Sequence, residues 1–191
     1  MTPKRIVVGV TGASGARYAK RLLSLLATSP AHPEVGCVLS KNARQVWSLE
    51  CGGDPEDLGI PIYGGDDYRA PFASGSAGWN AMVVIPCSMG TLGRIVHGTS
   101  DSLLTRAADV MLKERRLLIL VPRETPLSVI HLENQLAAAR AGALLLPASP
   151  SFYGRPRTLD DAIDTVVARV LDHLGVEHSL GHRWGSPTEK E

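Results

Sequence analysis

Residues 5–27 read RIVVGVTGASGARYAKRLLSLLA. From Ile6 to Val10 the residues are mostly β-branched and apolar, with polar residues on both sides, a pattern that predicts a buried strand. Between residues 15 and 27 the apolar residues recur at the spacing of a helix. Because the glycine-rich turn from Gly9 to Gly15 joins the two, this stretch predicts the strand–turn–helix unit of parallel α/β sheets.

The rest of the chain repeats this alternation of short apolar runs and longer periodic ones. Further strands are expected at 34–40, 80–87, 116–121 and 143–146, with a short one near 60–63. Further helices are expected from 43, at 90–97, at 101–114, from Thr125-Pro126 and at 159–174. Because the strands are continuously apolar, we predict an α/β fold whose parallel sheet is covered by helices on both faces.

One domain accounts for most of the chain, since 191 residues is the usual size of a single domain. We expect it to span residues 1–176 and to end with a helix that Thr158 caps and Gly175 terminates. Residues 177–191 then form a polar tail that carries Trp184. The segment 52–79 is rich in Gly, Pro, Asp and Ser and is expected to be mostly loop.

The composition excludes several classes of protein. The net charge of +1 creates no overall field for nucleic acid or an anionic membrane. No apolar run reaches the length of a signal peptide or a membrane span. Cys37, Cys51 and Cys87 are too widely spaced for a disulfide framework or a zinc site, and no other ligand spacing indicates a metal. We therefore expect a cytoplasmic protein without a metal.

The glycine turn after the first strand favours a phosphate-bearing ligand. Ligands of parallel sheets bind at the carboxyl ends of strands, where a helix N-terminus attracts phosphate. The turn has neither the GxGxxG spacing of a dinucleotide site nor the GK[ST] of a nucleotide-hydrolysing loop. The Tyr-x-x-x-Lys pair of short-chain dehydrogenases is also absent from the sequence. A mononucleotide is the favoured ligand, and a tight turn without a ligand is the alternative.

A second turn of this kind, Cys87-Ser-Met-Gly-Thr-Leu92, follows another predicted strand. Small and hydroxyl-bearing residues between a strand and a helix suit the same phosphate chemistry. Cys87 could be a nucleophile, but a buried structural thiol is the favoured interpretation because it closes an apolar strand. His131 lies between apolar neighbours and is also interpreted as structural.

Several basic residues have two possible interpretations. Arg106 and Lys113 share a helix face that is turned away from the apolar stripe, where Asp109 could form ordinary surface ion pairs with both. Arg123-Glu124 follows a strand and could grip phosphate and relay protons. Arg169 lies opposite the apolar stripe of the last helix, which indicates solvent or a neighbouring subunit.

Taken together, the motifs resemble the UbiX-type flavin prenyltransferases over residues 5–185. The motifs that carry this resemblance occur in the same order: Thr11-Gly-Ala-Ser-Gly15, Ser40-Lys41, Pro86-Cys-Ser-Met-Gly-Thr-Leu92, Arg106-Ala-Ala-Asp-Val-Met-Leu-Lys-Glu-Arg-Arg116, Val121-Pro-Arg-Glu-Thr-Pro-Leu127, His131-Leu-Glu-Asn134, Phe152-Tyr153 and Arg183-Trp184. The resemblance implies a Rossmann-like or flavodoxin-like three-layer sandwich that assembles as a dodecamer with active sites between subunits.

The resemblance also implies an activity. Members of this family join a dimethylallyl group from dimethylallyl phosphate to reduced FMN, first at N5 and then at C6, without a metal. The product, prenylated FMN, is the cofactor of UbiD-type decarboxylases. The choice between a monophosphate and a diphosphate donor, the partner decarboxylase and the pathway (ubiquinone biosynthesis or aromatic acid degradation) stay open.

The family's functional residues carry over by motif. The residues expected to hold FMN are Gly12, Ala13, Ser14, Ser40, Ser88, Met89, Gly90, Thr91 and Arg123. The residues expected to hold the donor phosphate are Arg106, Lys113, Tyr153 and Arg169. Ser14 is also expected among the catalytic residues, with Glu50 moving a proton near the flavin and Glu124 near the leaving phosphate. Trp184 is expected to offer a π face to the allyl cation.

Two other functions are weaker alternatives. An FMN-dependent cysteine decarboxylase would share the flavin turn, but such enzymes carry a Pro-x-Met-Asn-type motif where this chain has Pro147-Ala-Ser-Pro150. A non-catalytic flavin carrier of the flavodoxin type should be markedly acidic, whereas this chain is balanced in charge. A spectral response of bound reduced flavin to a prenyl phosphate would distinguish the enzyme from the carrier.

Overall fold

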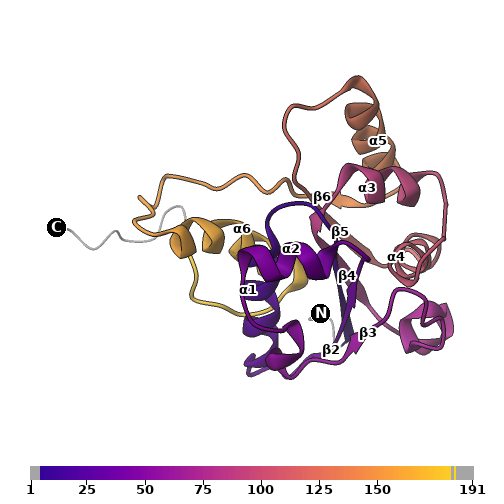
Figure 1. Cartoon of the computed structure of the whole chain (residues 1–191), viewed down its shortest axis with the longest axis horizontal. Coiled ribbons are helices and arrows are strands. Elements are labelled where there is room, and N and C mark those ends of the chain that lie inside the picture. Colours follow the sequence, from indigo (N-terminus) through magenta and orange to yellow (C-terminus); the bar gives the residue numbers. More distant parts are fainter. Residues whose placement is uncertain (1–4, 182, 184–191) are drawn as a thin grey trace.

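A six-stranded parallel sheet forms the centre of the computed structural model, which describes residues 5–181 and 183 (Figure 1). Its strands are β1 (Arg5–Val10), β2 (Glu34–Leu39), β3 (Ile62–Tyr63), β4 (Ala81–Cys87), β5 (Leu117–Pro122) and β6 (Leu144–Leu145). They lie in the order β3-β2-β1-β4-β5-β6, and all neighbouring pairs are parallel. Without the short β3 this is the flavodoxin-like order, and β3 extends it to the Rossmann order. The predicted α/β fold is confirmed.

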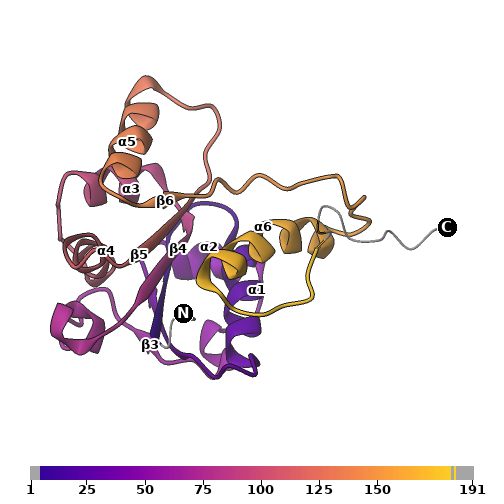
Figure 2. The same ribbon diagram turned by 180° about the vertical axis from the view of Figure 1, so that it is seen from behind.

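Helices cover both faces of the sheet and create the three layers (Figures 1 and 2). One face carries α1 (Ala16–Ala27), α2 (Ala43–Glu50) and α6 (Leu159–Leu174). The other face carries α3 (Met89–Val96), α4 (Leu103–Lys113) and α5 (Val129–Arg140), of which α5 packs mainly on α3. Within the described part of the chain, no helix is both long and apolar enough to cross a membrane.

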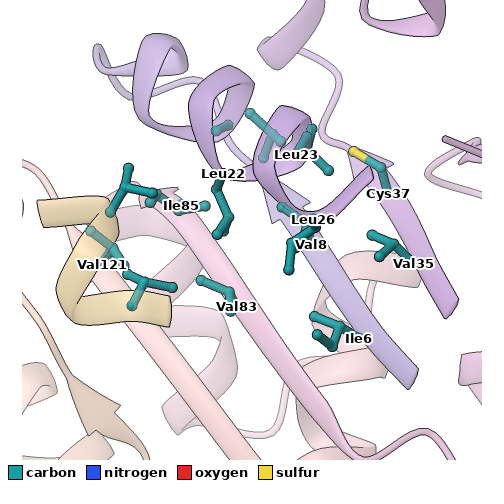
Figure 3. Close-up of a cluster of buried hydrophobic side chains, with 14 of the residues drawn as sticks. Ile6, Val8, Leu22, Leu23, Leu26, Val35, Cys37, Val83, Ile85 and Val121 are labelled. Atoms are coloured by element: carbon teal, nitrogen blue, oxygen red, sulfur yellow. The ribbon is translucent and has the colours of Figure 1, made fainter. Parts of the chain in front are cut away.

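The alternation of side chains along each strand divides the interior into two cores. Ile6 and Val8 of β1 belong to the core beneath α1 and α6, whereas Val7 between them belongs to the core beneath α4. Figure 3 shows Leu22 and Leu26 of α1 directed at the first of these cores. Replacing such a fully buried leucine by alanine costs about 2–5 kcal/mol, so these contacts hold α1, and with it the glycine turn, in place.

The helix expected from Thr125-Pro126 begins later than predicted. α5 starts at Val129, and Ser128 is its N-cap: the Ser128 hydroxyl accepts from the His131 N–H at 3.3 Å. The ring Nδ1 of His131 accepts in return from the Ser128 N–H at 3.2 Å. The prediction was wrong because Ser128 forms a reciprocal capping box, which stabilises a helix start more than a lone threonine does. His131 therefore has the structural role that the sequence favoured.

The segment 52–79 contains more structure than a loop. It forms β3 and three short 3-10 helices, Pro55–Leu58, Pro71–Ala73 and Gly75–Ala77. Phe72 is fully buried and packs edge-to-face on Tyr63 and on Trp79, with ring centroids 4.9 and 5.2 Å apart. A Cβ at Gly36 would lie 2.9 Å from the Phe72 ring, so glycine at this position of β2 admits the aromatic cluster. The segment thus completes the core beside α4.

Candidate active site

Four loops meet at the carboxyl edge of the sheet. They follow β1, β2, β4 and β5 and contain, respectively, residues 12–14, Ser40, Ser88 and Arg123-Glu124. Residues 89–91 continue from Ser88 as the first turn of α3. Adjacent strands β1 and β4 lead into α1 and α3, which cover opposite faces of the sheet. A strand order that reverses at this point opens a crevice between the two loops, where parallel sheets bind ligands. The structure brings the predicted flavin-binding residues to this one edge.

Thr11 joins the two walls of the crevice. Its hydroxyl donates to the Pro86 carbonyl at 2.7 Å and accepts from the Ser88 N–H at 2.9 Å. The residue is 1% exposed, so water does not replace either bond. The loops after β1 and β4 are therefore fixed relative to each other by one side chain. Thr11 opens one of the motifs that carry the resemblance, but it was not predicted as a site residue. The only signal for its role in the sequence is a hydroxyl at the end of an apolar strand.

Gly12 allows the loop after β1 to approach the loop after β2. A Cβ at Gly12 would lie 2.7 Å from the Asn42 Cβ, which is closer than real side chains come. The Ser40 N–H donates to the Val10 carbonyl at 2.9 Å and continues the same contact. The rim of the crevice thus runs without interruption from Ser40 to the glycine turn, and Ser14 is exposed on it.

Glu50 occupies the N-terminus of α1. Its Oε2 accepts from the N–H groups of Gly15 and Ala16 at 2.8 and 2.7 Å. Arg17 Nε donates to the Glu50 carbonyl at 2.9 Å and holds the end of α2 against α1. The anion that this helix N-terminus attracts is therefore a carboxylate of the chain itself, where the sequence pattern favoured phosphate. The proton-transfer role of Glu50 stays a prediction.

The N-terminus of α3 is the second helix start at this edge. The Ser88 hydroxyl accepts from the Thr91 N–H at 3.3 Å and donates to the Thr91 hydroxyl at 3.0 Å. The first N–H groups of a helix have no partner within the helix. Those of Met89 and Gly90 can therefore donate to a phosphate, and Gly90 is exposed.

A cavity of about 300 Å³ opens beside this helix, between the end of β5 and α5. It is lined by Met89, Pro122, Arg123, Glu124, Thr125, Leu127, Gln135, Pro147, Ala148 and Ser149. The Arg123 N–H donates to the Cys87 carbonyl at 3.2 Å, and the Glu124 carboxylate accepts from the Thr125 N–H at 3.0 Å. Burial raises the pKa of the Tyr18 hydroxyl, and the nearby charge of Arg123 opposes that rise. The cation of Arg123 and the carboxylate of Glu124 thus lie side by side in the lining of this cavity.

Cys87 is not available as a nucleophile. It is fully buried, and burial raises the pKa of its thiol to about 12. A thiol that stays protonated at neutral pH is a poor nucleophile. The interpretation of Cys87 as a structural residue is consistent with this environment.

The predicted phosphate ligands on helices are each paired with a carboxylate. Arg106 Nη1 lies 2.8 Å from Asp109 Oδ2, which confirms the expected ion pair, and its Nε donates to the Ala73 carbonyl at 3.1 Å. Lys113 pairs with Glu114 and not with Asp109. Arg169 Nη1 lies 2.6 Å from Asp172 Oδ2 and is 61% exposed. These pairs hold the basic side chains at the surface of the chain.

The four predicted phosphate ligands do not converge within one chain. Arg106 and Lys113 lie on α4, whereas Arg169 lies on α6, across the sheet (Figures 1 and 2). Tyr153 is in the loop between β6 and α6 and is 79% exposed. Trp184 lies outside the described residues. In that described part, no three His, Cys, Asp or Glu side chains are grouped to hold a metal.

Comparison with known proteins decides the family. Residues 1–171 match the family model named Flavoprotein. A flavin prenyltransferase UbiX of Methanocaldococcus jannaschii is 45% identical and aligns with 95% of this chain and 99% of its own length. The chain belongs to the UbiX family of flavin prenyltransferases.

Solved structures of UbiX proteins have the same fold. A dodecameric FMN-dependent UbiX-like decarboxylase from Escherichia coli O157:H7 superposes with a TM-score of 0.91 at 45% identity, over 95% of this chain and 100% of that one. AnUbiX (PadA1), in complex with FMN and dimethylallyl pyrophosphate, superposes with a TM-score of 0.86 at 41% identity, over 95% of this chain and 100% of that one. UbiX membership argues against both the cysteine decarboxylase and the non-catalytic flavin carrier.

Proposed function

We propose that this chain is a metal-independent flavin prenyltransferase. It transfers a dimethylallyl group from dimethylallyl phosphate to N5 and C6 of reduced FMN and supplies prenylated FMN to a UbiD-type decarboxylase. The observation that carries this proposal is the identity of about 45% to UbiX proteins along nearly the whole chain. We place the reaction in the cytoplasm because Cys37, Cys51 and Cys87 are free thiols.

The crevice suits FMN for three structural reasons. The start of α3, where Gly90 is exposed, offers N–H donors to a phosphate, with the Ser88 and Thr91 hydroxyls beside them. Gly12 has no side chain where the loop after β1 meets Asn42. Arg123 adds a cation at the end of β5. When bound, reduced FMN supplies the nucleophilic nitrogen and carbon, and the residues predicted to hold it orient those atoms.

The chemistry of the donor requires a neutralised leaving group. A monophosphate leaves slowly unless cations and a proton donor compensate its charge. Arg106, Lys113 and Arg169 supply positive charge, and the Tyr153 hydroxyl supplies a further donor. Protonated Glu124 donates a proton to the departing phosphate. With this set of donors a divalent metal is not needed.

Assembly completes the site. Since α4 and α6 cover opposite faces of the sheet, their basic residues can reach one phosphate only when different subunits contribute them. α5 exposes more than half of each of four large apolar side chains, Val129, Ile130, Leu132 and Leu136. Apolar patches of this kind mark protein interfaces. We therefore propose a homo-oligomer with shared active sites, a dodecamer as in the related Escherichia coli structure.

The test is mass spectrometry of the flavin after anaerobic incubation with dithionite, FMN and dimethylallyl phosphate. A product heavier than FMN by one isoprene unit is expected. A parallel reaction with dimethylallyl pyrophosphate decides the donor. Recovery of unmodified FMN from both reactions, with protein that binds FMN, contradicts the proposed function.

A further inference from the structure

Asp172 of α6 holds three basic side chains at once. Its Oδ2 accepts from Arg169 Nη1 at 2.6 Å, one helical turn earlier. Its Oδ1 accepts from His178 Nε2 and from Arg183 Nη2, both at 3.1 Å. The last two residues belong to the segment that follows α6. One carboxylate therefore links a predicted phosphate ligand to the segment beyond the helix.

His178 orients the Asp172 carboxylate. Its side chain is 5% exposed, and its Nδ1 accepts from the Leu180 N–H at 3.1 Å. A ring nitrogen that accepts a hydrogen bond carries no proton, so Nε2 is the protonated nitrogen and donates to Asp172. The buried imidazole thus fixes the position of Oδ1 and leaves Oδ2 to Arg169.

The carboxyl group stays ionised in this setting. Burial alone would raise the pKa of Asp172, but the hydrogen bond from His178 and the charges of Arg183 and Arg169 lower it overall. Arg169 is largely exposed, and a long exposed side chain samples many rotamers unless it has a partner. Asp172 supplies that partner with a geometry set by a buried residue.

We propose that Asp172 is a positioning residue for the donor: it holds the Arg169 guanidinium in the orientation that meets the donor phosphate. This inference rests on the proposed function. Orientation before binding reduces the ordering cost that the ligand must otherwise overcome. Asp172 acts through Arg169 and does not itself contact the donor, since a second anion beside the phosphate would repel it.

A double-mutant cycle tests this role. Isothermal titration calorimetry measures the Kd of dimethylallyl phosphate for enzyme loaded with oxidised FMN, in which no transfer occurs. Asp172→Asn is expected to weaken binding about tenfold, or about 1.4 kcal/mol. Because Asp172 acts through Arg169, adding Asp172→Asn to Arg169→Ala is expected to change the Kd of that variant less than twofold. Asp172→Glu, which keeps the charge, is expected to recover most of the affinity.

The control is Glu34→Gln, which removes the carboxylate partner of Arg5 at the amino end of the sheet and is expected to leave the Kd unchanged. The proposal would be overturned if Asp172→Asn changed the Kd of dimethylallyl phosphate by the same factor in the wild type and in the Arg169→Ala variant. It would also be overturned if Asp172→Asn left the Kd of the wild type unchanged. Loss of FMN binding by Asp172→Asn would also overturn it, because the residue would then serve stability alone. If the wild-type enzyme does not bind the donor and does not form product, the proposed function itself is contradicted.

Discussion

Thr11, Glu50 and Asp172 show how a single polar side chain can fix the backbone and the charged groups around it. The Thr11 hydroxyl pairs with two backbone groups at the end of β4, and the Glu50 carboxylate accepts from the first N–H groups of α1. Asp172 accepts from three basic side chains. Each of these side chains satisfies backbone or charged groups that lie far away in the sequence or on another element. Loss of one such partner leaves a buried donor or acceptor unsatisfied, which costs more than the bond itself contributes.

Replacing Thr11 by valine should therefore destabilise the chain. The change keeps the side-chain shape but leaves the Pro86 carbonyl and the Ser88 N–H without their partner. We expect the free energy of unfolding in urea to fall by about 1–3 kcal/mol, together with weaker FMN binding. Thr11→Ser keeps the hydroxyl and serves as the control. Coincident unfolding curves for wild type and Thr11→Val would contradict the role of Thr11.

Trp184 is the residue to test for the chemical step. Departure of phosphate leaves an allyl cation, and an indole face can stabilise a desolvated cation by about 2 kcal/mol. Losing that stabilisation slows a reaction roughly thirtyfold. We expect Trp184→Ala to bind FMN but transfer the prenyl group at least tenfold more slowly, whereas Trp184→Phe keeps most of the rate. Equal single-turnover rates for alanine and wild type would remove Trp184 from the mechanism.

Helix ends are the elements that build the crevice. The N-cap of α1 is Gly15, whose φ of 116° only glycine adopts readily, and the Glu50 carboxylate accepts from its N–H. α3 has Ser88 as its N-cap, and Gly90 in its first turn is exposed. The two starts lie at adjacent strands. Among the described residues, a carboxylate accepts from the first N–H groups of α1, and none accepts from those of α3. We therefore expect the phosphate of FMN at α3.

The contribution of Glu50 to the stability of the chain can be measured. Glu50→Ala leaves the Gly15 and Ala16 N–H groups without their acceptor and should destabilise the chain by about 1 kcal/mol. For a chain of this size that lowers Tm by about 2–4 °C in calorimetry. Glu50→Gln can still accept through its amide oxygen and should lower Tm less. If Glu50→Gln loses activity at an unchanged Tm, the proton-transfer role gains support. An unchanged Tm for Glu50→Ala would show that the cap has no stabilising effect.

The whole molecule separates the two halves of the donor site. The sheet stands between α4, with Arg106 and Lys113, and α6, with Arg169. No side chain reaches across a covered sheet, so assembly and activity should depend on each other. The exposed apolar side chains of α5 offer a surface on which to test this dependence.

A charge on that surface should break the assembly. Ile130 is 67% exposed in the single chain, and Ile130→Asp should place a carboxylate in the interface. We expect a smaller species in size-exclusion chromatography that has lost prenyl transfer. Ala31→Asp, an exposed loop residue at the amino end of the sheet, is the matched control and should stay assembled and active. An Ile130→Asp variant that elutes like wild type would exclude this face of α5 as an interface.

Chelation should leave the enzyme active. The cations that neutralise the leaving phosphate are arginine and lysine side chains, which EDTA does not remove. The rate of prenyl transfer is expected to be the same with and without EDTA. Loss of turnover that magnesium restores would show that the leaving group is stabilised by a metal.

The sequence by itself determined the order of strands and helices, the parallel sheet, the bounds of α6 and the grouping of flavin-site motifs at one edge. These depend on local signals: apolar periodicity, helix caps, and the rule that loops after parallel strands meet at the same edge. The tertiary structure alone decided that Ser128 caps α5, that Glu50 accepts from the first N–H groups of α1, and that Arg106 and Arg169 lie on opposite faces. Such contacts join residues far apart in the chain or choose between competing caps, and no local pattern encodes which partners packing will bring together.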